Sequence, residues 1–217
     1  MRLIIIGPPG SGKGTQANRL SERLGLAHVS TGDILRDAIK RQSPEGRSAS
    51  SYVATGRLVP DELVNEIIRA LFRGKKAPRQ FIMDGYPRTV AQADFFDRVL
   101  KDQGLDLGGV IFLQVPDEEI TERLSGRRTC PNPTCGASYH VKFQPPRRPD
   151  VCDRCDTRLV QREDDKPETI AKRLAVYHAV YDELVDHYRR GGCLKEIDGV
   201  GDMEAVYERI LEALKTC

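Results

Sequence analysis

A glycine-rich segment near the start of the chain, LIIIGPPGSGKGTQ, carries the residue types that bind phosphate. Four glycines lie in it: Gly7, Gly10, Gly12 and Gly14. Because glycine has no Cβ, such a loop can turn sharply and direct its backbone N–H groups at phosphate oxygens. Lys13 adds a positive charge, and a following helix adds its positive N-terminal end. The strict pattern has Ser or Thr directly after the lysine. Here Gly14 takes that position and Thr15 follows, so we predict a variant phosphate-binding loop.

A second group with chemistry-bearing spacing is a set of four cysteines in the pattern C-x4-C-x16-C-x2-C: Cys130, Cys135, Cys152 and Cys155. Two ligands from each of two turns fit a tetrahedral structural zinc ion. The first pair is two residues longer than the usual C-x2-C, so its turn must differ. We predict Zn²⁺, with Fe²⁺ or a reduced, empty site as alternatives. Disulfides rank lower in a reducing compartment, and a redox pair lacks a thioredoxin-like context.

Composition narrows the class of protein. The chain has 217 residues, with 34 Lys and Arg against 32 Asp and Glu, and this balance argues against a dedicated nucleic-acid binder. No apolar run approaches the ~20 residues of a membrane helix. The first apolar run has four residues, Leu3–Ile6, whereas a signal peptide has about 7–15. We therefore expect a cytoplasmic protein with no membrane or nucleic-acid partner.

The strands and helices that must position the phosphate loop and the cysteines are indicated by short apolar runs that alternate with helical patterns. Five runs are typical of buried strands: Leu3–Ile6, Ala27–Val29, Phe81–Met83, Val110–Val115 and Leu194–Ile197. Helical periodicity follows in residues 17–24, 63–71, 93–100, 170–188 and 206–214. Pro167 and Asp202 are suitable starts for the last two helices. The alternation predicts an α/β fold with a parallel sheet covered on both faces.

Two segments interrupt this alternation and are interpreted as insertions. Residues 30–59 are polar and contain short helical pieces. Residues 126–165 are rich in Arg, Pro, Cys and Asp, with almost no helical periodicity.

Further motifs follow the phosphate loop in a fixed order: STGDILR at Ser30–Arg36, GRLVPDELV at Gly56–Val64, DGYPRTVAQA at Asp84–Ala93, RLSGRR at Arg123–Arg128, REDD at Arg162–Asp165 and RL at Arg173–Leu174. Together with GPPGSGKGT they resemble the adenylate kinase family of nucleoside monophosphate kinases, in its long-lid form, over nearly the whole chain. The resemblance implies a P-loop three-layer fold, a five-stranded parallel sheet in the order 2-3-1-4-5, and a monomer. It also implies a core of residues 1–29, 60–125 and 166–217, an AMP-binding insertion at 30–59, and a zinc-bearing lid at 126–165.

The reaction that the resemblance implies is Mg·ATP + AMP ⇌ 2 ADP, which serves adenine nucleotide homeostasis. Phosphoryl transfer asks the protein for in-line positioning and positive charge. A phosphate acceptor has a second pKa of ~6, so it is already an anionic nucleophile and needs no general base. Arginines suit this work because their planar forks bind phosphate oxygens in pairs.

The resemblance also implies roles for individual residues. Catalytic roles fall to Lys13, Arg88, Arg123, Arg162 and Arg173. ATP would contact Gly10, Ser11, Gly12, Lys13, Gly14, Thr15, Arg123, Arg127, Tyr139, His140 and Gly201. AMP would contact Thr31, Arg36, Arg57, Val59, Gly85, Arg88, Gln92, Arg162 and Arg173. Asp33 and Asp84 would hold Mg²⁺ through water, and Asp164 and Asp165 would pair with arginines at the lid hinge. Asp202 takes a place where the family often has a proline against adenine.

Each role has a plainer alternative. Asp33 is also a helix cap, Asp84 a turn residue, Gln92 an exposed helix residue, His140 a surface histidine, and any one arginine a solvated charge. For the whole protein, the alternatives are a kinase for UMP or CMP and a non-catalytic, ATP-gated nucleic-acid-binding module. The Thr31/Gln92 pair and the long lid argue against the first, and the balanced charge argues against the second.

Overall fold

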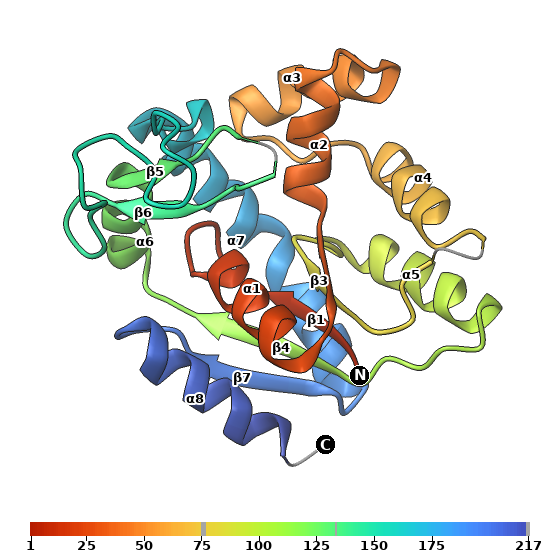
Figure 1. Ribbon diagram of the computed structural model, residues 1–217. Helices are drawn as coiled ribbons and strands as arrows, with labels where there is room; N and C mark the ends of the chain where they lie inside the picture. The colour runs from red at the N-terminus through yellow and green to blue at the C-terminus, as the bar shows by residue number, and fades with distance from the viewer. Residues whose placement is uncertain (75–76, 133, 216–217) are drawn as a thin grey trace.

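The computed structural model describes residues 1–74, 77–132 and 134–215 and contains a five-stranded parallel sheet (Figure 1). Its strands are β1 (Arg2–Ile6), β2 (Ala27–Ser30), β3 (Phe81–Asp84), β4 (Gly109–Gln114) and β7 (Leu194–Asp198). They lie in the order β2-β3-β1-β4-β7, all parallel. Since β7 is the fifth strand of this sheet, the predicted order 2-3-1-4-5 is confirmed.

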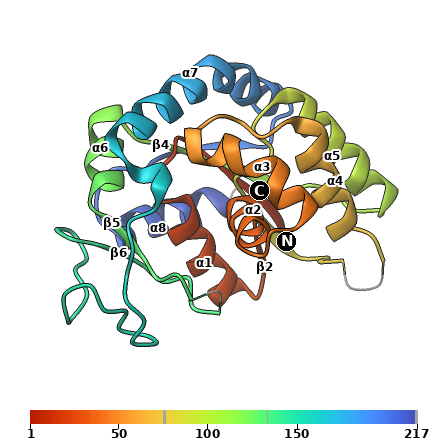
Figure 2. The ribbon, with the colours of Figure 1, turned by 90° about the horizontal axis from the view of Figure 1, so that it is seen from above.

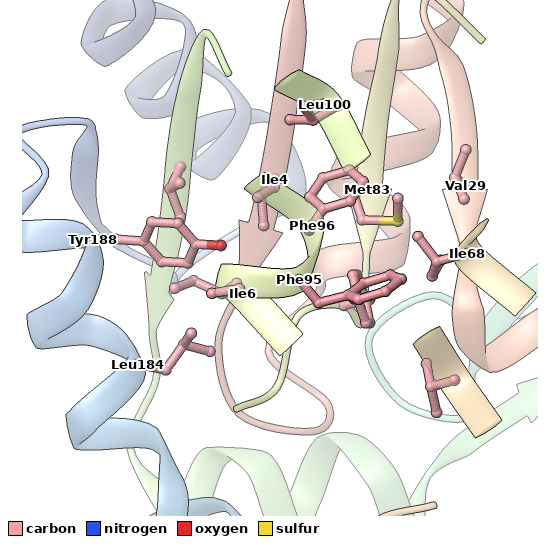
Figure 3. Close-up of a cluster of buried hydrophobic side chains, with 14 of the residues drawn as sticks. Ile4, Ile6, Val29, Ile68, Met83, Phe95, Phe96, Leu100, Leu184 and Tyr188 are labelled. Carbon is pink, nitrogen blue, oxygen red and sulfur yellow. The ribbon is translucent and has the colours of Figure 1, made fainter. Parts of the chain in front are cut away.

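Alternate side chains of β1 point to opposite faces of the sheet, as the period of a strand requires. Leu3 and Ile5 belong to the cluster under α1 (Lys13–Leu24) and α8 (Met203–Leu214). Ile4 and Ile6 lie in the cluster shown in Figure 3, which includes Phe96, Met83 and Tyr188. The helices over that second face are α4 (Asp61–Leu71), α5 (Val90–Asp102) and α7 (Pro167–Arg190). The result is a three-layer fold.

The starts of the last two helices agree with the sequence prediction. Pro167 is in the first turn of α7, and the Asp202 side chain accepts a hydrogen bond from the Ala205 N–H at 2.8 Å. One further helix, α6 (Asp117–Ser125), was not predicted. Its signals are present, because Pro116 precedes three acidic residues in the first turn.

Residues 30–59 fold into two helices, α2 (Thr31–Lys40) and α3 (Pro44–Thr55), which stand at the top of Figure 1. The two helices approach closely at Gly46, where a Cβ would lie 2.1 Å from the Ala38 carbonyl oxygen. The expected helical pieces are therefore present, and only glycine fits at that contact.

Residues 126–165 project from one side of the molecule as a lobe (Figure 2). The lobe holds a short antiparallel pair, β5 (Arg127–Thr129) and β6 (Ser138–His140), and a 3-10 turn, η1 (Glu163–Asp165). These two strands were not predicted, because three residues are too few for alternation to show. In the described ranges, no helix has the length and apolar character needed to cross a membrane.

Candidate active site

A cavity of about 1170 Å³ lies over the carboxyl ends of the central strands, where open α/β sheets bind ligands. Its walls come from the glycine-rich loop, from the α2–α3 segment and from the β5–β6 lobe. All the nucleotide and magnesium residues predicted from the sequence line it: Gly10, Ser11, Gly12, Lys13, Gly14, Thr15, Thr31, Asp33, Arg36, Arg57, Val59, Asp84, Gly85, Arg88, Gln92, Arg123, Arg127, Tyr139, His140, Arg162, Arg173 and Gly201. Residues from across the chain thus meet at one cavity.

The glycine-rich loop presents the open end of α1 to this cavity. Gly10 and Gly12 have φ of 82° and 94°, which side chains with a Cβ rarely adopt. A Cβ at Gly10 would lie 2.7 Å from the Leu124 side chain. Gly12 caps α1 without a side-chain hydrogen bond, so the first N–H groups of the helix are left for a ligand. This arrangement suits an anion.

Lys13 rests on the loop itself. Its Nζ donates hydrogen bonds to the carbonyl oxygens of Gly7 at 2.8 Å and Pro8 at 2.6 Å. The pKa of Lys13 is lowered to about 7, mainly by burial. Asp84 opposes this shift, and Arg88 and Arg173 add to it. A bound polyphosphate would supply the missing negative charge.

The carboxyl end of β3 places Asp84 beside the loop, with its Oδ2 3.3 Å from the point where a Cβ on Gly14 would lie. The Thr31 hydroxyl donates to the Asp84 carbonyl oxygen at 3.2 Å, and His28 Nε2 lies 3.4 Å from the Asp84 carboxylate. Gly85 has a φ of 78°, and a Cβ there would lie 3.0 Å from the Thr31 hydroxyl. Asp84 is therefore held at the cavity wall rather than exposed in a turn.

Asp33 is the second acidic residue in the cavity wall. Its Oδ1 accepts a hydrogen bond from Arg36 at 2.6 Å. Burial would raise the pKa of Asp33, but the charge and hydrogen bond of Arg36 outweigh it and lower the pKa. The Asp33 backbone N–H donates to Ser30, so Ser30 is the cap of α2 and Asp33 is not.

Gln92 is only 2% exposed, which excludes the exposed-helix alternative. Its Nε2 donates to Asp61 Oδ1 at 2.6 Å, and its Oε1 accepts from the Arg88 N–H at 2.8 Å. Asp61 also accepts from the Thr89 hydroxyl at 2.7 Å. These partners fix the amide orientation and leave one N–H and one lone pair for a ligand. Asp61 was not predicted as the residue that orients Gln92, because in the sequence it resembles an acidic helix start.

A buried ion-pair network connects the lobe to α7. Asp165 is fully buried and accepts hydrogen bonds from Arg127 at 2.8 and 2.6 Å. Arg173 lies 3.3 Å from Asp165 and 3.0 Å from the Asp164 carboxylate. Burial would raise the pKa of Asp164, but Arg173 and other arginines hold it below its usual range. The expected pairing of these two aspartates with arginines is confirmed.

The remaining arginines leave an excess of positive charge. Burial, together with Arg36 and Arg127, lowers the pKa of Arg162 to about 9. The Arg88 side chain is exposed at the cavity, yet desolvation by the surrounding protein lowers its pKa as well. Arg123 lies 2.8 Å from Glu119 and donates to the Gly199 carbonyl oxygen at 3.1 Å. An anionic ligand would relieve the repulsion that Arg36 and Arg127 exert on Arg162.

Arg57 follows the end of α3 and lines the cavity. Its guanidinium stacks over the Tyr52 ring at 4.8 Å, and its Nε donates to the Thr55 hydroxyl. This stacking fixes the direction of a charge that is otherwise exposed.

Two lobe residues that line the cavity, Tyr139 and His140, have their polar atoms hydrogen-bonded within the protein. His140 Nδ1 accepts from the N–H groups of Lys142 and Phe143, both at 3.0 Å, so Nε2 carries the proton and donates to the Glu122 carbonyl oxygen. The His140 ring stacks on Phe143 at 4.3 Å. The Tyr139 hydroxyl accepts from the backbone N–H of Asp153 at 2.9 Å. His140 is therefore a fixed corner of the lobe, not a mobile surface histidine.

The four predicted cysteines converge in the lobe. Their sulfur atoms all lie within 4.8 Å of one another, with Cys130 and Cys155 at 3.4 Å and Cys135 and Cys152 at 3.6 Å. A disulfide would need about 2.05 Å. Tetrahedral thiolates around zinc, each about 2.3 Å from the ion, lie about 3.8 Å apart. The donor set and spacing therefore fit a closed four-thiolate site. Of the long first turn, Pro133 lies outside the described residues.

Comparison with known proteins gives one consistent result. The family model described as adenylate kinase matches residues 5–193. The adenylate kinase of Caldicellulosiruptor saccharolyticus is 47% identical over 214 residues, which cover 99% of each chain. That of Carboxydothermus hydrogenoformans is 46% identical over 99% of this chain and 100% of the relative. That of Archaeoglobus fulgidus is 44% identical over the full length of both.

Proposed function

The chain belongs to the adenylate kinase family and transfers a phosphoryl group reversibly from Mg·ATP to AMP, giving two ADP, and we propose that this reaction takes place in the cavity described above. The observation that carries the proposal is the convergence of a phosphate loop and six arginines on one cavity: Arg36, Arg88, Arg123, Arg127, Arg162 and Arg173. This much positive charge matches two nucleotides, whose facing phosphates would otherwise repel each other.

The two nucleotides would bind from opposite sides of the cavity. The loop from Gly10 to Thr15, with Lys13, Arg123 and Arg127, takes the phosphates of ATP. Tyr139, His140 and Gly201 line the adenosine side of the same nucleotide. This places the terminal phosphoryl group near Lys13 and Asp84.

AMP would bind at the α2–α3 side. Its phosphate meets Arg36 and Arg88, and its base meets Gln92 and Thr31, with Arg57, Val59 and Gly85 in the surrounding wall. The remaining N–H and lone pair of Gln92 match the donor and acceptor edge of adenine. Arg162 and Arg173 lie between the two sites and balance the charge that moves between them.

Mg²⁺ would enter with ATP and neutralise charge on its phosphates, with Asp33 and Asp84 as the residues that hold it through water. The acceptor needs no general base because the AMP phosphate is already ionised. The work of the protein is therefore alignment and electrostatic stabilisation.

We further propose a division of the chain by these roles. Residues 1–29, 60–125 and 166–217 form the core, 30–59 the AMP-binding domain and 126–165 the lid. A lid that closes over the phosphates excludes water and so suppresses ATP hydrolysis. Within it, Zn²⁺ on the four cysteines is structural, because the lobe buries few apolar side chains of its own. The protein acts as a cytoplasmic monomer, without nucleic-acid or membrane partners.

The roles are tested by separating the two sites kinetically. Arg88→Ala should raise KM for AMP by at least about 10-fold and affect KM for ATP less, while Arg123→Ala should do the reverse. Arg98→Ala, an exposed arginine of α5, is the matched control and should change neither constant. If Arg88→Ala instead weakens ATP alone, the assignment of sites is wrong.

A further inference from the structure

Tyr181 lies in the middle of α7 and is 7% exposed, yet it belongs to the lining of the nucleotide cavity. Its ring packs against Phe112 of β4 and against Tyr177 one turn earlier on α7, with centroid distances of 6.0 and 4.1 Å. In the sequence it resembles one more apolar position of a long helix. In the structure, however, its hydroxyl group has a hydrogen-bond partner in the phosphate loop.

The Tyr181 hydroxyl oxygen accepts a hydrogen bond from the backbone N–H of Gly7, the first glycine of the phosphate loop. The carbonyl oxygen of Gly7 accepts from Lys13 Nζ at 2.8 Å. Gly7 is therefore held on both sides, by α7 and by the lysine. When Lys13 turns toward a phosphate, the hydrogen bond from the Gly7 N–H to Tyr181 still holds the start of the loop.

Because the hydroxyl accepts from Gly7, its own proton must point elsewhere. In the described parts of the chain this hydroxyl donates no hydrogen bond. The charged groups that act on it are Asp84, the last residue of β3, and Arg88, in the segment that follows this strand. Burial raises the pKa of Tyr181 well above its usual value, so the hydroxyl keeps its proton at neutral pH.

We propose that Tyr181 is a further catalytic residue, whose hydroxyl donates a hydrogen bond to a phosphate oxygen between the ATP loop and Arg88. The inference rests on the proposed function, since it uses the places assigned to the two nucleotides. A neutral donor in this position stabilises charge on the transferring group without adding to the repulsion among the arginines. Its oxygen is fixed by Gly7, so the donor is already oriented before the substrates arrive.

The test compares Tyr181→Phe with Tyr177→Phe in the full-length protein. The second variant makes the same change one turn away, at a tyrosine that also lines the cavity but does not bond to the loop. For Tyr181→Phe we expect kcat to fall about 10- to 100-fold, the range for one lost hydrogen bond to a charged group. The dissociation constants of ATP and AMP should each change by less than about 3-fold, and Tyr177→Phe should match the wild type in all three.

A purely structural role of Tyr181 makes a different prediction, namely weaker ATP binding and a lower melting temperature with no separate loss of kcat. Weaker ATP binding and a lower melting temperature without a separate loss of kcat would overturn the proposal. So would an unchanged kcat in Tyr181→Phe, or an equal loss of kcat in Tyr177→Phe. In each case the wild type would remain an active kinase, so the proposed function would stand. If wild type itself failed to convert AMP, the proposed function would fall first.

A measurement on the unaltered chain covers the case in which Tyr181→Phe does not fold. With tyrosines labelled with ¹³C at Cζ, the Tyr181 signal should shift when ATP and AMP together fill the cavity. An unmoved Tyr181 signal in the saturated protein would contradict the proposal.

Discussion

The carboxylate of Asp165 accepts two hydrogen bonds from the guanidinium of Arg127, at 2.8 and 2.6 Å, and is itself fully buried. The pair joins the first strand of the lobe to the turn that leads into α7. Arg127, which is proposed to bind ATP, is thus held in place by a carboxylate that is buried from solvent. Stability and nucleotide binding are connected at this point.

Replacing Asp165 by Asn should therefore destabilise the protein strongly. The change leaves Arg127 and Arg173 beside each other with their shared counter-charge removed, and loss of one partner of a buried pair costs about 3–5 kcal/mol. Urea unfolding should show a loss of about 3 kcal/mol or more. Asp156→Asn is the control, because Asp156 pairs with Arg148 at the exposed surface and should cost less than about 1 kcal/mol. Equal stability of the two variants would contradict the account.

Replacing Lys13 by Met should abolish most activity without harming the fold. The ammonium group is the only lysine charge in the cavity lining of the described chain, and loss of one such group lowers kcat by about 100-fold or more. The melting temperature should stay the same or rise, since a buried charge is removed. Lys101→Met, at an exposed position of α5, serves as control. Undiminished turnover in Lys13→Met would show that this loop does not serve phosphoryl transfer.

ATP binding should take up a proton at pH 8. The pKa of Lys13 is lowered from 10.5 to about 7, so the amine is mostly neutral at that pH. Polyphosphate favours the charged form and raises the pKa, which draws up to about one proton from the buffer. Calorimetric titrations in two buffers of different ionisation enthalpy measure this uptake. The uptake should vanish in Lys13→Met, and its persistence there would assign it to another group.

The same shift has a consequence for stability. A lysine with a lowered pKa costs free energy while it is charged, that is, fully below about pH 7. The cost should decline between pH 7 and 10.5, so wild type should gain stability relative to Lys13→Met over that interval.

Removing the lobe metal should lower stability without directly altering the phosphate site. A strong chelator, or Cys152→Ser, should abolish stoichiometric zinc and lower the melting temperature by several degrees, because metal binding contributes folding energy. Cys193→Ser is the matched control, since Cys193 lies outside the four-cysteine cluster. Full metal content and an unchanged melting temperature in Cys152→Ser would refute a structural metal site.

The sequence was informative about the sheet for a physical reason. Strands such as Leu3–Ile6 are buried on both faces, so they appear as continuous apolar runs that end where Gly or Asp begins. The loop around Lys13 was equally clear, because the backbone conformations at Gly10 and Gly12 leave few other residue types. Strand burial and loop conformation each depend on residues that are adjacent in the sequence, so both can be predicted from it.

Relationships between distant residues were not visible in the same way. That Gln92 is oriented by Asp61, or that Gly7 is bound by Tyr181 across 174 positions, depends on the packing of helices on the sheet. Tyr181 shares the periodicity of its apolar neighbours, and Asp61 shares the acidic start of an ordinary helix. Neither residue type signals its partner.

The most direct test of the central claim is to supply Mg·ATP to the purified protein with one acceptor at a time, AMP, UMP, CMP or GMP, and to follow all nucleotides by chromatography. We expect rapid conversion with AMP alone, two ADP formed for each AMP consumed, and almost no ATP hydrolysis when the acceptor is absent. Faster conversion with UMP or CMP, or nucleic-acid binding without any turnover, would contradict the central claim.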